Sequence, residues 1–405
     1  MARKPVRDLT REEQLARGPV DLPFLMLVLI LFGIGLIMLL SASSASARYD
    51  YAANYDPTFY FRRQLLFGAA GLVCMYVVSK INYQTFRWMS VFVLIAAYVF
   101  LILVFTPLGY GRATVGAQRW IQIGPINFQP SEIAKVGVVL YFSARLSKRR
   151  EGPHQFKHRL VQPLEGIRGV LDRIGLLELI PYGLILLTIA ALMLKEPHMS
   201  GTILVLAAGA AVIFAAGIKM YWFLGGGAAV AVALAYIMLG TGYQSDRITT
   251  WQNPWSDPGD KGYQIIQSLY AIASGGLSGL GLGKSRQKYL YLPEEHNDFI
   301  FAIICEELGL IGAAIIMLLF AALILRGYWI ALHTRDRFGC LLVVGVTTLI
   351  AMQTFLNIGV VTGLLPTTGI SLPFFSYGGT ALSIQLAEMG IVLSVSRQMK
   401  PTKAG

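Results

Sequence analysis

The sequence predicts an all-α polytopic membrane protein with about ten transmembrane helices. Of its 405 residues, 55% are hydrophobic and only 14% are charged, which leaves too little polar surface to cover a soluble protein of this size. The apolar residues also gather in long runs. A helix needs roughly 20 such residues to cross about 30 Å of hydrocarbon, and several runs reach that length.

Ten apolar segments meet or approach this length. They are 22–42, 64–80, 87–107, 132–147, 176–194, 201–217, 220–240, 299–325, 338–360 and 378–396. The fourth is the weakest of them, because it is short and contains Lys135 and Arg145. No cleavage site of small residues follows the first segment, so we expect that segment to be retained as a helix.

Arginine and lysine are distributed unevenly between the two sides of this bundle. With the N-terminus inside, the inner segments carry 21 of these residues and the outer segments carry 11. Cytoplasmic loops carry the excess of positive charge, so both termini are predicted to be cytoplasmic. The chain then divides into a tail 1–21, a transmembrane domain 22–396 and a tail 397–405. The net charge of +12 follows from this topology, and no nucleic-acid partner is expected.

A large polar outer loop, 241–298, separates the seventh and eighth helices and is the first candidate for a functional site. It contains the stretch N-P-W-S-D-P-G-D-K-G-Y-Q, in which two prolines and a tryptophan surround Asp257. A carboxylate held in such a setting suits a general base. The alternative is that Asp257 only opens a turn before a proline, and spacing alone favours that alternative. Asp260 and Asp298 are rival carboxylates.

The second half of this loop is rich in glycine and in basic residues. Lys284, Arg286 and Lys288 follow a run of glycines and are suited to pair with phosphate oxygens, although a solvated turn explains them equally well. The stretch 265–282 is nearly apolar. It predicts short helices that pack on the membrane surface.

Other polar residues lie within or beside the predicted spans. Glu306 and Glu307 lie about two turns into the eighth segment, where either a function or a pairing with a neighbouring helix accounts for such costly groups. Glu132 and Lys135 are three residues apart, hence on one helical face and able to pair. Trp120, in the outer loop before them, fits an interfacial aromatic belt.

The segment 363–380 contains prolines and glycines at membrane depth, which predicts a re-entrant or broken helix that is buried or lines a cavity. The three cysteines are scattered through apolar segments, so neither a metal site nor a disulfide framework is expected. Together these features predict an outward-facing cavity with irregular backbone at its floor. A lipid-handling enzyme and a transporter both fit this description.

Four stretches of the chain resemble the SEDS family of shape, elongation, division and sporulation proteins. They are R-W-I-Q-I-G-P-I-N-F-Q-P-S-E-I-A-K, N-P-W-S-D-P-G-D-K-G-Y-Q, S-R-Q-K-Y-L-Y-L-P-E-E-H-N-D-F-I-F-A and T-G-I-S-L-P-F-F-S-Y-G-G-T. The second and third are most similar to the division and sporulation types. Two positions depart from the family: Asp260 stands where glycine is common, and Asn297 replaces the usual threonine before Asp298.

The resemblance implies a peptidoglycan glycosyltransferase of the bacterial cytoplasmic membrane. Such an enzyme polymerises lipid II on the extracytoplasmic face during cell division or sporulation. The implied partners are a class B penicillin-binding protein, other division proteins and membrane lipid. The family's essential aspartate falls on Asp257 and its essential tryptophan on Trp120. We therefore predict Asp257 to be the general base of an inverting transfer from an undecaprenyl-pyrophosphoryl donor.

Substrate-binding residues are predicted around this base, some of them as cations for the pyrophosphate. The candidates are Trp120, Arg119, Glu132, Lys135, Arg247, Lys261, Lys288, Asp298 and Ser376. No tightly bound cofactor and no metal site made by the protein are expected. A divalent cation, Mg²⁺ or Mn²⁺, would accompany the substrate pyrophosphate.

Two other functions fit the same hydropathy. A lipid II flippase needs a polar path across the whole bilayer, whereas the polar residues here crowd the outer half. A non-catalytic division scaffold would dock through the basic loop 148–175 and would not require Asp257.

Overall fold

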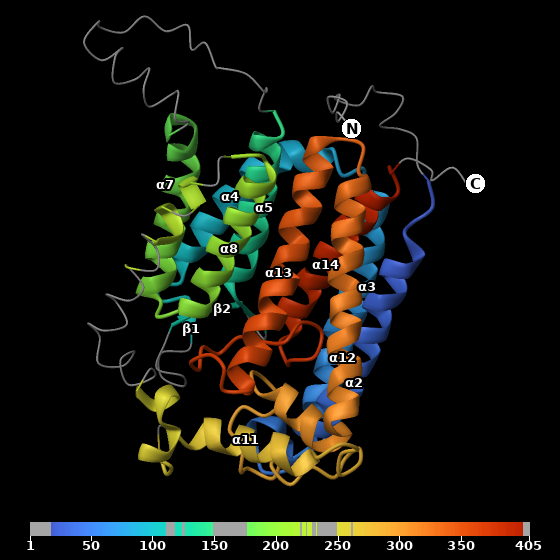
Figure 1. Cartoon of the computed structure of the whole chain (residues 1–405), viewed down its shortest axis with the longest axis vertical. Helices are drawn as coiled ribbons and strands as arrows, with labels where there is room; N and C mark the ends of the chain where they lie inside the picture. The colour runs from blue at the N-terminus through green and yellow to red at the C-terminus, as the bar shows by residue number, and fades with distance from the viewer. Residues whose placement is uncertain are drawn as a thin grey trace, which may run out of the picture.

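Long apolar helices form the body of the molecule (Figure 1). The computed structural model describes residues 18–110, 118–123, 126–148, 176–218, 221–223, 225–228, 232, 249–260 and 262–399. Among them, six helices are long and apolar enough to cross a membrane: α2 (Leu22–Ala47), α3 (Phe59–Lys80), α4 (Thr85–Leu103), α12 (Ile300–His333), α13 (Arg337–Val361) and α14 (Gly379–Ser396). Three more helices run beside them: α5 (Pro130–Leu146), α7 (Leu176–Lys195) and α8 (Met199–Ala215).

These helices confirm the predicted polytopic all-α fold. Nine of the ten predicted segments each overlap one helix. The seventh, 220–240, lies largely outside the described residues. The eighth was predicted to end at residue 325, but α12 continues to His333.

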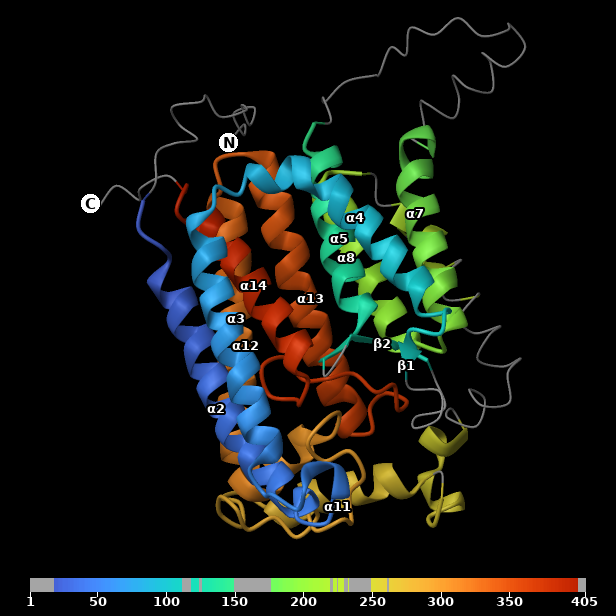
Figure 2. The same cartoon turned by 180° about the vertical axis from the view of Figure 1, so that it is seen from behind.

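The helix ends that belong to the first and last spans lie together. Asp21 caps α2, since its carboxylate accepts from the Phe24 amide at 3.0 Å. The same carboxylate pairs with Arg326 of α12 at 2.7 Å, and the Asp21 amide donates to Ser396 at the end of α14 at 3.1 Å. The described part of the insert lies at the opposite end of the bundle (Figures 1 and 2).

Close packing of α3 against α14 depends on small residues. A methyl group at Gly71 would lie 2.7 Å from Leu386, and one at Gly390 would lie 2.6 Å from the Met75 carbonyl oxygen. In a membrane there is no hydrophobic driving force between helices, so glycines that let backbones approach contribute van der Waals contact.

A small antiparallel sheet in the loop after α4 was not predicted. Its strands are β1 (Gly109–Tyr110), β2 (Trp120–Ile123) and β3 (Ile126–Phe128), in the order β1-β2-β3. Trp120 pairs with Tyr110, and Gln122 pairs with Asn127. The strands are two to four residues long, too short for a strand period to stand out in a sequence scan.

The described part of the insert packs across the end of the bundle. Its helix α11 (Tyr263–Gly275) lies across the direction of the long helices in both views (Figures 1 and 2), and the short 3-10 helix η2 (Pro254–Ser256) precedes it. A second 3-10 helix, η1 (Tyr51–Ala53), lies between α2 and α3. Between α13 and α14 the chain from 362 to 378 is irregular, which confirms the predicted break in helix.

Candidate functional site

A cavity of about 740 Å³ lies between the helices and the irregular segment. Its lining residues come from α3, α5, α8, α11, α13 and α14, from the β2 strand, and from the loops 294–299 and 367–378. Of the predicted site residues, the cavity brings together Arg119, Trp120, Glu132, Lys135, Asp298 and Ser376. The predicted cavity with irregular backbone in its wall is therefore present.

The first helical turns of α5 place an ion pair in the cavity wall. Lys135 Nζ lies 2.7 Å from Glu132 Oε2, and the two side chains are only 4% and 14% exposed. Glu132 lies in the first turn of α5, where a negative charge is stabilised by the helix dipole. The predicted pairing of these residues is confirmed. Because the pair faces a cavity, a ligand anion can compete with Glu132 for the ammonium.

Arg119 and His198 form the neighbouring part of the wall. Arg119 Nη2 donates to the Pro197 carbonyl oxygen at 2.5 Å. Burial, followed by the positive charges of Arg119 and Lys135, lowers the pKa of His198 to about 3. The imidazole is therefore neutral at physiological pH. His198 was missed by the sequence analysis, because a single histidine in a short helix connection carries no motif.

A third cation, Arg63 of α3, was also missed. It lines the cavity and hydrogen bonds Tyr377, whose pKa is raised by burial. The rings of Tyr60 and Tyr377 meet edge to face at 4.9 Å between centroids, and Tyr60 also lies 4.6 Å from the ring of His296. Arg63 thus stands beside an aromatic wall. In the sequence, Arg63 lies at the start of an apolar run, where a basic residue indicates only how the helix is oriented in the membrane.

Side-chain amides hold the irregular segment in place. Gln64 donates to the Ser376 carbonyl oxygen at 3.0 Å and accepts from the Gly378 amide at 3.2 Å. Asn357 donates to the carbonyl oxygens of Asp298 and Ile370 at 2.7 and 2.6 Å. These bonds satisfy backbone groups that a non-helical segment leaves open.

Ser376 serves the same purpose through its hydroxyl. The hydroxyl donates to the Asn297 carbonyl oxygen at 2.7 Å and accepts from the Leu372 amide at 2.7 Å. Ser376 was predicted to bind substrate. Although it lines the cavity, its hydroxyl already joins the loop 294–299, which contains Asp298, to the irregular segment 362–378.

Asp257 lies at the insert end of the molecule but is not among the residues that line the cavity. It ends η2, and its carbonyl oxygen accepts from the Gly262 amide at 2.9 Å, so the predicted turn exists. Its carboxylate accepts no hydrogen bond from any residue that the structure describes. The group is half-buried and available to a ligand.

Two tryptophans hold the Asp257 turn on the rest of the molecule. Trp251 Nε1 donates to the Gly363 carbonyl oxygen at 2.7 Å, which ties the insert to the start of the irregular segment. The ring of Trp255 packs against that of Tyr270 on α11, with 5.8 Å between centroids. The turn is thereby fixed at the insert end, on the same side as the cavity-lining loops.

One predicted cation, Lys288, does not line the cavity. Lys288 is 2% exposed and pairs with Glu307, away from the cavity lining. The prediction that it contacts substrate disagrees with this geometry, because a buried ammonium is stabilised by a fixed partner. Arg247 and Lys261 lie outside the described residues. For Glu306 and Glu307, the structure shows the pairing alternative, with partners on the insert and on α2.

The comparisons with known proteins agree with this fold. The profile of the FtsW, RodA and SpoVE family, described as "Cell cycle protein", matches residues 22–401. The Stage V sporulation protein E of Bacillus subtilis is 39% identical over 93% of this chain and 97% of its own length. A Geobacter protein named "Probable peptidoglycan glycosyltransferase FtsW" is 38% identical, over 94% of this chain and 97% of its own length.

Two solved structures share the architecture. A chain from a peptidoglycan synthase complex that coordinates polymerization and crosslinking superposes with a TM-score of 0.73 at 28% identity, covering 93% of this chain and 98% of the other. The rod shape determining protein RodA of Thermus thermophilus gives a TM-score of 0.66 at 25% identity, with 95% and 98% covered. The resemblance seen in the sequence is confirmed: the chain belongs to the FtsW/RodA/SpoVE family, also called the SEDS family, of multi-pass membrane proteins.

Proposed function

We propose that this protein is a peptidoglycan glycosyltransferase that polymerises lipid II in the cytoplasmic membrane, during cell division or sporulation. One observation in the structure supports the proposal independently of the similarity to named proteins. The cavity at the insert end gathers three cations, Arg63, Arg119 and Lys135, in the wall of a helical bundle. A lipid-linked pyrophosphate needs such a site: cations for its phosphates beside apolar helices for its isoprenoid tail.

The cations act on the leaving group. As the bond between the anomeric carbon and the pyrophosphate oxygen breaks, negative charge grows on the leaving phosphate. Arg63, Arg119 and Lys135 are already fixed in the wall, so they stabilise that charge without reorganising at the moment of reaction. The phosphate competes with Glu132 for Lys135, which lies at the pairing distance of 2.7 Å in the structure.

Asp257 is the proposed general base. It takes the proton from the 4-hydroxyl of the acceptor sugar as that oxygen bonds to the anomeric carbon of the donor, which inverts the carbon and releases undecaprenyl pyrophosphate. Support comes from its open carboxylate and from the tryptophan anchors that fix its turn. The acceptor sugar would lie between this turn and the cavity, with the insert end outside the cell.

Accessory groups follow from the same proposal. Among the described residues, no three His, Cys, Asp or Glu side chains gather to hold a metal. A divalent cation, Mg²⁺ or Mn²⁺, would be held mainly by the substrate phosphates, and the carboxylates of the lining are those of Glu132, Glu294 and Asp298. A class B penicillin-binding protein is the proposed partner, since polymerised strands must then be crosslinked.

The test is polymerisation by the purified protein, with its penicillin-binding partner, supplied with labelled lipid II. The unmodified protein should make glycan strands, and Asp257→Ala should reduce the rate by at least about 100-fold, the ordinary contribution of a positioned base. Asp260→Ala, in the same turn, is the matched control and should retain activity. If Asp257→Ala is folded and polymerises normally, the assignment is wrong. Movement of lipid II between vesicle leaflets without any polymer would instead identify a flippase.

A further inference from the structure

A basic turn of the insert, residues 283–291, presents some of its side chains to the protein and others to solvent. Ser285 and Lys288 are buried, whereas Lys284, Arg286 and Tyr289 are exposed. The buried side chains fasten the turn, and the exposed ones line a separate hollow. The three cations of the turn therefore have two different roles: Lys288 fastens the turn, and Lys284 and Arg286 face the hollow.

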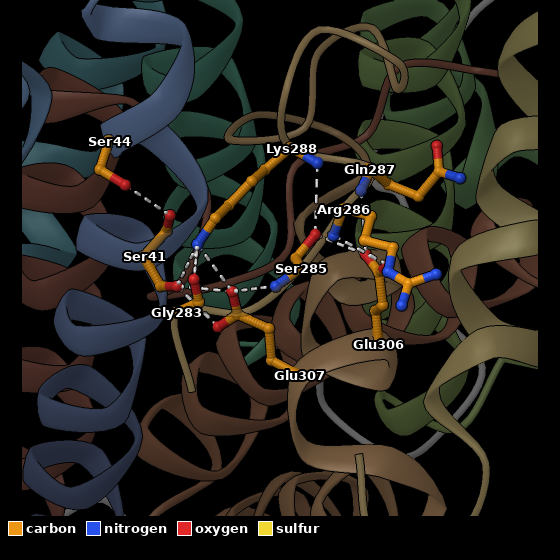
Figure 3. Close-up of polar contacts among 9 residues, drawn as sticks. All are labelled: Ser41, Ser44, Gly283, Ser285, Arg286, Gln287, Lys288, Glu306 and Glu307. Carbon is orange, nitrogen blue, oxygen red and sulfur yellow. Dashed lines mark hydrogen bonds and ion pairs between the residues drawn. The ribbon is translucent and has the colours of Figure 1, made fainter. Parts of the chain in front are cut away.

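Glu307 of α12 holds one end of the turn (Figure 3). Its carboxylate pairs with Lys288 Nζ at 3.0 Å and accepts from the Ser285 amide at 3.2 Å. The hydroxyl of Ser41 on α2 donates to the same carboxylate at 2.6 Å. Lys288 Nζ donates again to the Gly283 carbonyl oxygen at 2.7 Å. Three segments far apart in the sequence thus meet at one buried carboxylate.

Glu306 holds the middle of the turn. It accepts from the backbone amides of Arg286 at 3.0 Å and Gln287 at 3.3 Å, and from the hydroxyl of Ser285 (Figure 3). Hydrogen bonds to a carboxylate are about twice as strong as neutral ones. The backbone of the turn is therefore fixed, and the direction of its exposed side chains is fixed with it.

Those exposed side chains line an open hollow of about 710 Å³, here called the basic hollow. Its lining residues are Gly283, Lys284, Ser285, Arg286, Gln287, Tyr289 and Tyr291. Tyr289 and Tyr291 are 52% and 56% exposed. Within the described part of the chain, the side chains of Lys284 and Arg286 have neither a hydrogen bond nor an ion pair. Two cations and two rings thus stand open in one rigid frame.

The basic hollow and the cavity are lined by neighbouring stretches of the chain. Tyr291 lines the hollow and Glu294 lines the cavity. Three residues span at most about 11 Å. The hollow and the cavity therefore have lining residues within about 11 Å of each other.

We propose that the basic hollow binds the newly made glycan strand as it leaves the catalytic cavity. This inference rests on the proposed polymerase function. The apolar faces of sugar rings pack on exposed tyrosines. Carboxylates of the peptides that the strand carries pair with Lys284 and Arg286. A phospholipid headgroup would use the two cations but would leave the rings without a role.

Direct binding tests this proposal independently of catalysis. Soluble, uncrosslinked glycan strands that carry their peptides are labelled and titrated with the full chain in detergent. Lys284→Ala with Arg286→Ala, and Tyr289→Ala with Tyr291→Ala, should each weaken binding by about tenfold or more. The matched controls are Lys148→Ala and Tyr51→Ala, which remove an exposed lysine and an exposed tyrosine elsewhere. All four hollow side chains are exposed, so the thermal unfolding midpoint should not change.

Polymer length gives the second readout. The hollow variants should make markedly shorter strands, because each strand dissociates earlier, while they consume lipid II at the normal initial rate. Binding and strand length equal to those of the unmodified protein would overturn the proposal. So would variants that bind glycan normally but retain fewer anionic phospholipids, since the hollow would then be a headgroup site. If the unmodified protein makes no polymer at all, the proposed function fails. The binding titration still shows whether the basic hollow binds glycan strands.

Discussion

Replacing Lys288 with methionine tests whether this lysine fastens the insert or contacts substrate. Methionine keeps the length and apolar stem of the side chain and removes only the charge. In the structure, the ammonium lies 3.0 Å from Glu307, and the two side chains are 3% and 0% exposed. Removing one partner of a buried pair leaves the other charge uncompensated, which costs about 3–5 kcal/mol.

The expected loss is toward the lower end of that range. Glu307 keeps two donors in the variant, the Ser41 hydroxyl and the Ser285 amide. We therefore expect Lys288→Met to lose about 3 kcal/mol of unfolding free energy, measured by denaturant titration in detergent. Adding Glu307→Gln should restore at least half of that loss, because the amide carries no charge to compensate.

The outcome separates the two roles of Lys288. A lysine that binds pyrophosphate would give a variant of normal stability that polymerises lipid II poorly, and Glu307→Gln would not rescue it. If Lys288→Met changes the unfolding free energy by less than about 0.5 kcal/mol, the fastening described here is wrong.

Two further predictions concern positions outside the proposed catalytic residues. Burial raises the pKa of Glu196 to about 8, against a weaker lowering by Arg119. The unfolded chain loses this proton near its ordinary pKa of about 4.3 and the folded chain does not, so stability should fall as pH rises from about 4.5 to 8. Melting temperatures across that range should slope less in Glu196→Gln, and equal slopes would contradict the assignment. At the kink of α12, Gly309 has φ 66° and ψ −173°, and an added methyl group would lie 2.5 Å from the Leu277 carbonyl oxygen. Gly309→Ala should cost at least about 2 kcal/mol, whereas Gly33→Ala, with open space at the methyl position, should be neutral in the same unfolding assay.

Much of the fold was accessible from local patterns. Apolar run length located nine helices, and the three-residue spacing of Glu132 and Lys135 predicted their ion pair. The glycines and prolines before α14 predicted its irregular approach. Each of these is a property of one segment, so one segment of sequence suffices to predict it.

Which basic residues of the insert are buried and which are exposed could not be predicted from one segment of sequence. Lys284, Arg286 and Lys288 alternate along one turn, yet the first two are exposed and the third is buried. Only the position of Glu307, 19 residues further on, selects Lys288 as the internal partner. The cavity cation Arg63 was likewise assigned only by packing, because it lies on α3, apart in sequence from Arg119 and Lys135.

The sequence by itself determined that this chain crosses a membrane many times and that it belongs to the SEDS family. Hydropathy, charge bias and local motifs carry that information, since each depends on neighbours along the chain. The tertiary structure alone decided which charged side chains face a cavity and which fasten the insert. That choice depends on partners such as Gln64 and Ser376, which are 312 residues apart and meet only when the bundle closes.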